Sequence, residues 1–165
     1  MLNWVKGTFS STVYIQLWEE RIIIAHVESQ SVFEESPYIA IDNKEKQKPV
    51  VIAVGNEAYR LLGSSRYEVS NPFSHPRLLV NDFEKAEKVL QYATRTVCKA
   101  KLFMPAPTVI IHPCEKLEGG LTDIECRVFR ELALGVGARK VYLHTGHDIP
   151  LVGFSLSSVN EPETM

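Results

Sequence analysis

Short apolar segments rich in β-branched residues predict strands in the first third of the chain. Residues 12–17 (TVYIQL) and 21–27 (RIIIAHV) are separated by Trp18, Glu19 and Glu20, so we expect a β-hairpin with a tight turn. Further elements are expected as strands over 36–41 and 50–54 and a short helix over 57–62 that ends at Gly63. Residues 64–76 show no periodicity and predict a turn-rich segment.

Two longer helices are predicted in the second half. After Asp82, a typical N-cap residue, apolar side chains recur at spacings of three and four, at Phe83, Ala86, Val89, Leu90, Ala93 and Val97. Thr122 and Glu125 form a capping box that begins a second helix, which ends at Gly135. Apolar strands are expected over residues 108–111 and 140–144.

The order of these elements predicts an α/β fold. Adjacent antiparallel strands are followed by a helix, a strand, a helix and a strand. That order implies a mixed sheet flanked by helices.

Composition narrows the class of protein. The chain has 165 residues, 45% of them hydrophobic and 23% charged, which is ordinary for one globular domain. Lys and Arg number 18 and Asp and Glu 20, so no basic surface is expected for nucleic acid. The three cysteines (Cys98, Cys114 and Cys126) lack C-x-x-C spacing and are typical of reduced thiols in a cytoplasm.

No catalytic group of residues emerges from the pattern. His112 and His144 each end a buried strand, where a pair of histidines can hold a metal or move a proton. Cys114 is the nearest candidate third ligand, and we favour ordinary strand-end histidines over a metal site. The chain contains no G-x-S-x-G motif and no P-loop. We therefore expect no catalytic residue, no metal and no bound cofactor.

The first residues combine aromatic and aliphatic side chains with a single charge. Residues 1–9 contain Leu2, Trp4, Val5 and Phe9, with Lys6 as their charged side chain. One interpretation is a tail or a segment that packs on its own domain, which composition alone favours. The other is an interfacial anchor with weak, reversible membrane contact through these four residues.

Several segments together resemble the first half of MreB, the bacterial actin homologue that governs rod shape, over residues 1–150. The segments, in matching order, are 53–58 (AVGNEA), 80–90 (VNDFEKAEKVL), 105–111 (PAPTVII), 127–131 (RVFRE) and 135–143 (GVGARKVYL). The resemblance implies an actin-like, ribonuclease-H-like lobe over residues 12–152. Its core would comprise residues 12–32 and 78–152, and residues 33–77 would form a small subdomain inserted between these two segments. Residues 1–11 and 153–165 would be the N-terminal and C-terminal tails. Several members of this family carry an amphipathic N-terminal membrane anchor, and this favours the membrane interpretation of residues 1–9.

The sequence departs from this family at the nucleotide site. Where the family has Asp-Leu-Gly-Thr, a loop that wraps the phosphates, this chain has Gln16, Leu17, Trp18 and Glu19. The family's Glu-Glu-Pro after the last strand is replaced by residues 145–147 (TGH). The chain also ends where the family's second half, which supplies the other phosphate loop, would begin. The departures imply a degenerate ATPase-like fold that does not hydrolyse ATP.

We therefore expect an MreB-like cell-shape or envelope-associated protein with a nucleotide-independent interaction role. Expected partners are a protein of that machinery or a second copy of the chain, bound through an interface that includes Trp18 and Phe154. The expected location is the cytoplasm, with peripheral contact at the inner membrane. Two alternatives stay open: a nucleotide-binding protein completed by a partner lobe, and a stand-alone binding module unrelated to cell shape.

Overall fold

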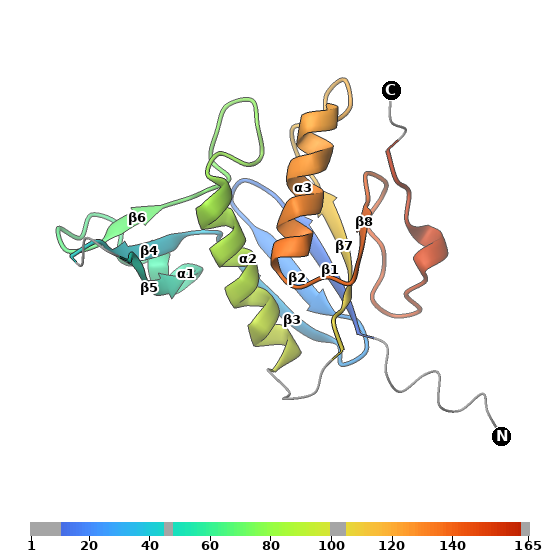
Figure 1. Cartoon of the computed structure of the whole chain (residues 1–165), viewed down its shortest axis with the longest axis horizontal. Helices are drawn as coiled ribbons and strands as arrows, with labels where there is room; N and C mark the ends of the chain where they lie inside the picture. Colours follow the sequence, from blue (N-terminus) through green and yellow to red (C-terminus); the bar gives the residue numbers. More distant parts are fainter. Residues whose placement is uncertain (1–10, 45–47, 100–104, 163–165) are drawn as a thin grey trace.

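A five-stranded mixed sheet forms the larger part of the computed structural model, which describes residues 11–44, 48–99 and 105–162 (Figure 1). In spatial order its strands are β3 (Ser31–Glu35), β2 (Ile22–His26), β1 (Thr12–Leu17), β7 (Thr108–Pro113) and β8 (Lys140–Leu143). β1, β2 and β3 pair antiparallel, whereas β7 pairs parallel with both β1 and β8. The mixed α/β sheet and the β1–β2 hairpin predicted from the sequence are confirmed.

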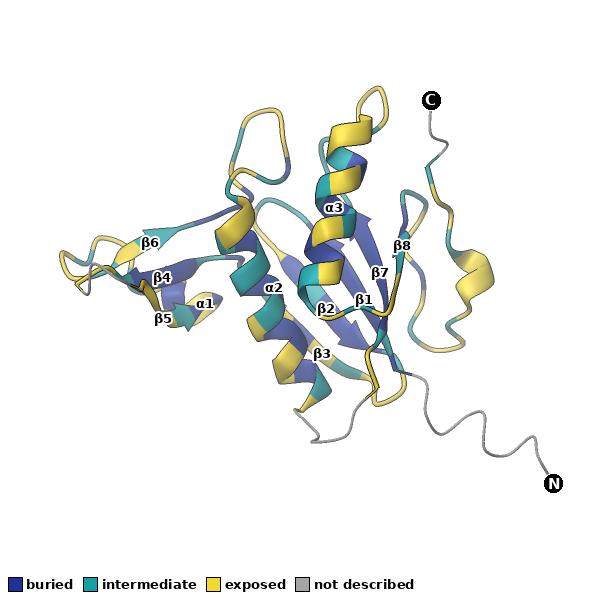
Figure 2. Cartoon of the chain, viewed as in Figure 1, coloured by how far each residue is buried: buried dark blue, intermediate teal, exposed yellow. Residues whose placement is uncertain are grey.

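Two helices, α2 (Phe83–Cys98) and α3 (Asp123–Gly135), cover one face of this sheet (Figure 1). Both begin at the predicted residues. The Asp82 side chain accepts a hydrogen bond from the Lys85 amide, and Thr122 and Glu125 form the complete capping box. Figure 2 shows that each helix is buried toward the sheet and exposed on its outer side.

Alternation along the strands divides the sheet into two faces. Val13, Ile15 and Leu17 of β1 point toward the helices, in a cluster that also holds Val89 and Leu132. On the opposite face Tyr14 and Ile110 pack against the chain that follows β8. The residues from that C-terminal segment are Ile149, Leu151, Phe154 and Val159. The helices therefore flank one face, and residues 149–159 cover part of the other.

A second, three-stranded sheet lies beside the first (Figure 1). Its strands are β5 (Val50–Val54), β4 (Ile39–Asp42) and β6 (Glu68–Ser70), and the one-turn helix α1 (Asn56–Tyr59) follows β5. Residues 33–35, assigned from the sequence to the inserted subdomain, belong instead to the larger sheet through β3. The small sheet begins at Ile39.

Several element predictions need correction. The strand expected over residues 36–41 is shorter and begins at Ile39, while β3 and β6 were not predicted. The helix expected over 57–62 is the single turn of α1. Both unpredicted strands are short, and β3 has one buried side chain, Phe33, between exposed Val32 and Glu34, so neither strand has a strong local signal. Leu2, Trp4, Val5 and Phe9 lie outside the described residues.

Candidate functional site

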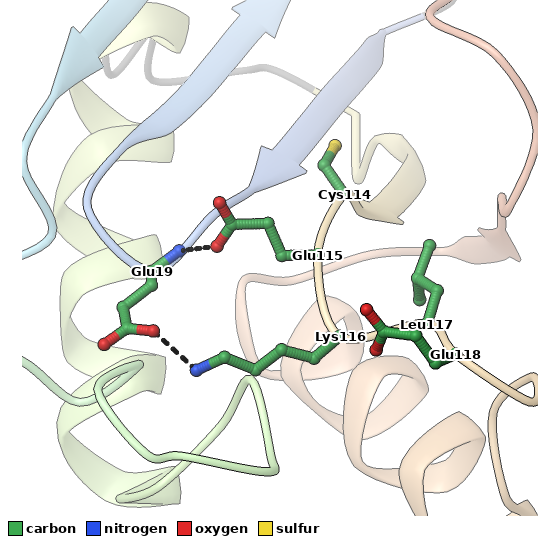
Figure 3. Close-up of a pocket in the computed structure, with 6 residues that line it drawn as sticks. All are labelled: Glu19, Cys114, Glu115, Lys116, Leu117 and Glu118. Atoms are coloured by element: carbon green, nitrogen blue, oxygen red, sulfur yellow. Dashed lines mark hydrogen bonds and ion pairs between the residues drawn. The ribbon is translucent and has the colours of Figure 1, made fainter.

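The turn of the β1–β2 hairpin is held by a carboxylate from a distant part of the chain. The Glu19 amide donates to Oε2 of Glu115, which follows β7, at 2.8 Å (Figure 3). Glu115 reaches this amide because β1 and β7 are parallel neighbours, with Gln16 opposite His112. The Glu115 carboxylate is therefore the acceptor for the Glu19 amide of the hairpin turn.

Lys116 ties the same turn to a loop from the other side. Its Nζ lies 2.7 Å from Oε2 of Glu19 and also donates to the carbonyl of His75. Asn71 Nδ2 donates to the Glu19 carbonyl at 2.7 Å, and Ser74 Oγ donates to Oε1 of Glu19 at 3.2 Å. The hydrogen bond from Lys116 lowers the pKa of the Glu19 carboxyl. The hairpin turn is thus fixed between the loops that follow β6 and β7.

An open cavity of about 600 Å³ lies beside this turn (Figure 3). Its lining residues are Glu19, Cys114, Glu115, Lys116, Leu117 and Glu118. Three carboxylates and one ammonium give the lining a net negative charge at neutral pH. The cavity is therefore electrostatically unfavourable for a polyphosphate.

A buried polar cluster lies on the sheet face opposite the helices. The Tyr14 hydroxyl lies 2.7 Å from Nδ1 of His112 and accepts a hydrogen bond from the Ile149 amide at 3.3 Å. The hydroxyl hydrogen is therefore available for donation to Nδ1. Burial, with a smaller contribution from the adjacent His144, lowers the pKa of His112 to about 4. The His112 ring is neutral near pH 7.

His144 is held by backbone groups on both ring nitrogens. Its Nδ1 accepts from the Asn160 amide at 2.9 Å, and its Nε2 donates to the His147 carbonyl at 2.7 Å. Because an amide can only donate, these contacts select the tautomer with hydrogen on Nε2. The ring centroids of His112 and His144 are 4.5 Å apart in an edge-to-face arrangement.

Side chains of Gln16, Cys114 and Asp148 border this cluster. Gln16 Nε2 donates to Oδ1 of Asp148 at 3.1 Å, and that oxygen lies 4.0 Å from Nδ1 of His112. Cys114 Sγ donates to the His112 carbonyl at 3.3 Å, and burial raises the pKa of the thiol to about 12. Together His112, Cys114 and Asp148 bring one nitrogen, one sulfur and one oxygen within 4.8 Å of one another.

The residues predicted from the sequence to mark the degenerate loop and the interface lie in different surroundings in the structure. Gln16 joins the polar cluster, Leu17 is buried in the core, and Glu19 lines the cavity. Trp18 packs under the Arg21 guanidinium at 4.2 Å from its ring, while the Phe154 ring lies 6.2 Å from Tyr14. The two expected interface residues thus contact different neighbours, and their role in an interface stays a prediction.

Sequence reasoning brought His112 and His144 together but missed their partners. The missed partners are Tyr14, Asp148 and Asn160. Glu115 and Lys116, which hold Glu19 at the hairpin turn, were also missed. The spacing of His112 and Cys114, two residues apart at a strand end, was the available local signal for a ligand site.

Comparison with known proteins places these residues in a family context. The family model of the MreB/Mbl protein matches residues 10–164. The cell shape-determining protein MreB of Escherichia coli (strain K12) is 32% identical over 145 residues, covering 87% of this chain and 40% of that protein. MreB of Pasteurella multocida (strain Pm70) is 29% identical over 141 residues, covering 84% of this chain and 39% of that protein. The chain spans about two fifths of the length of these relatives.

Solved structures share the fold. MreB5 of Spiroplasma citri bound to ADP superposes with a TM-score of 0.63 at 20% identity, covering 82% of this chain and 38% of that one. A non-polymerising A278D mutant of MamK bound to AMPPNP gives a TM-score of 0.57 at 13% identity, covering 82% and 40%. The actin-like fold expected from the sequence is confirmed. In the part of the chain that the structure describes, neither long helix is apolar over enough length to cross a bilayer.

Proposed function

Because this chain belongs to the MreB/Mbl family, we propose that it acts in the cell-shape machinery through protein contacts and does not bind or hydrolyse nucleotide. The partner is MreB, another protein of that machinery, or a second copy of the chain. The protein works in the cytoplasm, and Leu2, Trp4, Val5 and Phe9 give it peripheral contact with the inner membrane.

One observation carries the nucleotide-independent part of this proposal. The Glu19 amide at the hairpin turn already donates to the Glu115 carboxylate at 2.8 Å. A phosphate that approached this amide would have to displace a negatively charged acceptor fixed in the same chain. Two like unit charges about 4 Å apart repel by about 4 kcal/mol at an effective dielectric constant of about 20.

The neighbouring residues add to this argument. Trp18 stands where the related loop has glycine, and its ring is held by the Arg21 guanidinium. A glycine lets backbone approach a ligand closely, whereas an indole fills that space. Lys116, the cation of the cavity lining, is paired with Glu19. The turn is therefore occupied by side chains of the protein itself.

The direct test is calorimetric titration of the full chain with Mg-ATP and with Mg-ADP. We expect no heat beyond dilution, while MreB5 of Spiroplasma citri, whose structure holds ADP, serves as the positive control. The triple variant Gln16→Asp, Trp18→Gly, Glu19→Thr, which restores the family loop, should still show no ATPase activity. Saturable binding of either nucleotide to the unmodified chain would refute the proposal.

A second measurement tests the partner. Surface-immobilised chain should bind full-length MreB from the same cell saturably, and Trp18→Ala should weaken that binding at least tenfold because buried Trp is a frequent interface anchor. Tyr59→Ala, which removes an exposed aromatic ring on α1, is the matched control. Mg-ATP binding that appears only with MreB present would instead favour a nucleotide site completed by a partner lobe. Absence of MreB binding, together with a monomeric chain in light scattering, would favour a stand-alone module.

A further inference from the structure

Three side chains with metal-binding atoms converge where the parallel strands of the larger sheet end. His112 lies in β7, Cys114 follows it, and Asp148 lies in the loop after β8. Their ligand atoms, a ring nitrogen, a thiol sulfur and a carboxylate oxygen, all lie within 4.8 Å of one another. The carboxyl ends of parallel strands are the usual location of ligand sites in open α/β sheets.

Neighbouring groups hold each of the three in place. Cys114 is anchored by its amide, which donates to the Leu17 carbonyl at 2.9 Å. The Asp148 carboxylate accepts from Gln16, and the His112 ring packs edge-to-face on the His144 ring, with centroids 4.5 Å apart. Such partners of the ligands fix ring orientation and carboxylate position in known metal sites.

We propose that His112, Cys114 and Asp148 bind a divalent transition-metal ion, with Zn²⁺ as the best match. Imidazole, thiolate and carboxylate are the three side-chain ligands that zinc uses in proteins. Mg²⁺ and Ca²⁺ prefer sites built from oxygen atoms alone, so a site with nitrogen and sulfur disfavours them. Binding releases the thiol proton to solvent, because the thiolate is the ligand.

The geometry needs only a small closure. With metal–ligand distances of about 2.0–2.3 Å, ligand atoms in a tetrahedral site lie about 3.5 Å apart. The observed spread of up to 4.8 Å therefore requires a contraction of roughly 1 Å. Oδ1 of Asp148 lies 4.0 Å from Nδ1 of His112, and this side chain, which is 73% exposed and lies in a loop, can move toward the other two ligand atoms. The Tyr14 hydroxyl would give up Nδ1 of His112 and keep its hydrogen bond to the Ile149 amide.

The ion has a route from solvent and room for a further ligand. Asp148 also lines a cavity of about 320 Å³ together with His144 and His147, and Cys114 lines the larger cavity beside the hairpin turn. The site therefore lies between two openings, with His112 as its buried side. A water molecule from either opening can complete the coordination.

The test uses Co²⁺ as a spectroscopic substitute for Zn²⁺ on the full, tag-free chain after chelator treatment. We expect one equivalent to produce a thiolate-to-cobalt charge-transfer band that Zn²⁺ then abolishes by displacing Co²⁺. Cys114→Ser should remove the band, and Asp148→Asn should weaken binding at least tenfold. Cys98→Ser and Cys126→Ser are matched controls, because both thiols belong to the core on the opposite face of the sheet, and they should leave the band unchanged.

The unfolding temperature is a second measure of metal binding that does not depend on the thiolate-to-cobalt band. Zn²⁺ should raise the unfolding temperature of the wild-type chain and of both control variants, since a ligand that binds only the folded state stabilises it. It should not raise that of Cys114→Ser, and far-ultraviolet circular dichroism checks that each variant is folded. A charge-transfer band that persists in Cys114→Ser, or no band and no stabilisation in the wild type, would overturn the proposal.

Discussion

Removing the Tyr14 hydroxyl is the sharpest test of the buried polar cluster. Tyr14 is 2% exposed, and its hydroxyl joins Nδ1 of His112 to the Ile149 amide. Tyr14→Phe keeps the ring, which packs near Phe154, and deletes only the oxygen. The substitution therefore isolates two hydrogen bonds from the packing of the aromatic side chain.

The expected cost follows from what is left behind. Both partners stay buried, since His112 is 3% and Ile149 5% exposed. An unsatisfied buried polar group costs about 1–3 kcal/mol. The contact to Ile149 is long at 3.3 Å and contributes less, so we expect a loss of about 2–3 kcal/mol in the free energy of unfolding. For a domain of this size that corresponds to a fall of about 4–12 °C in the unfolding temperature.

Urea unfolding followed by circular dichroism measures this loss directly. Tyr142→Phe is the matched control, because Tyr142 lies on the same sheet face and its hydroxyl has no hydrogen bond among the described residues. It should change the stability by less than about 0.5 kcal/mol. If Tyr14→Phe is as stable as Tyr142→Phe, the cluster is not held by the Tyr14 hydroxyl and the reasoning is wrong.

Three further predictions concern charge, association and the N-terminal residues. A hydrogen bond from Lys85 lowers the pKa of the Glu68 carboxyl, so the pair stabilises the fold fully above the ordinary carboxyl pKa of about 4.3. This stabilisation is lost as the pH falls through the lowered pKa, and the urea midpoint should fall with it. Glu68→Gln should make that fall in the urea midpoint smaller. Light scattering at micromolar concentration should show a dimer or a larger assembly that Trp18→Ala shifts to monomer while Tyr59→Ala does not; a monomeric wild-type chain contradicts self-association. Deleting residues 1–9 should abolish sedimentation with anionic vesicles and leave the unfolding temperature unchanged; equal sedimentation of both forms contradicts the anchor.

Local signals in the sequence were sufficient for much of the fold. Asp82 and the pair Thr122 and Glu125 mark helix starts that the structure confirms, because a cap needs only residues three positions apart. The hairpin of β1 and β2 was equally readable from two β-branched runs and a short connection. β3 and β6 were not, because their place in a sheet depends on hydrogen bonds to strands rather than on a pattern of their own.

The candidate site also has a part that the sequence predicts and a part that only the tertiary structure decides. Gln16, Leu17, Trp18 and Glu19 stand where the family resemblance implies a phosphate-binding loop, and this prediction needs the sequence alone. The carboxylate that occupies the Glu19 amide comes from Glu115, 96 positions away, and Tyr14 is 98 positions from His112. Asp148 is brought to Gln16 across 132 positions. Only the parallel pairing of β1, β7 and β8 brings these groups together, because a strand order specifies contacts that no spacing along the chain encodes.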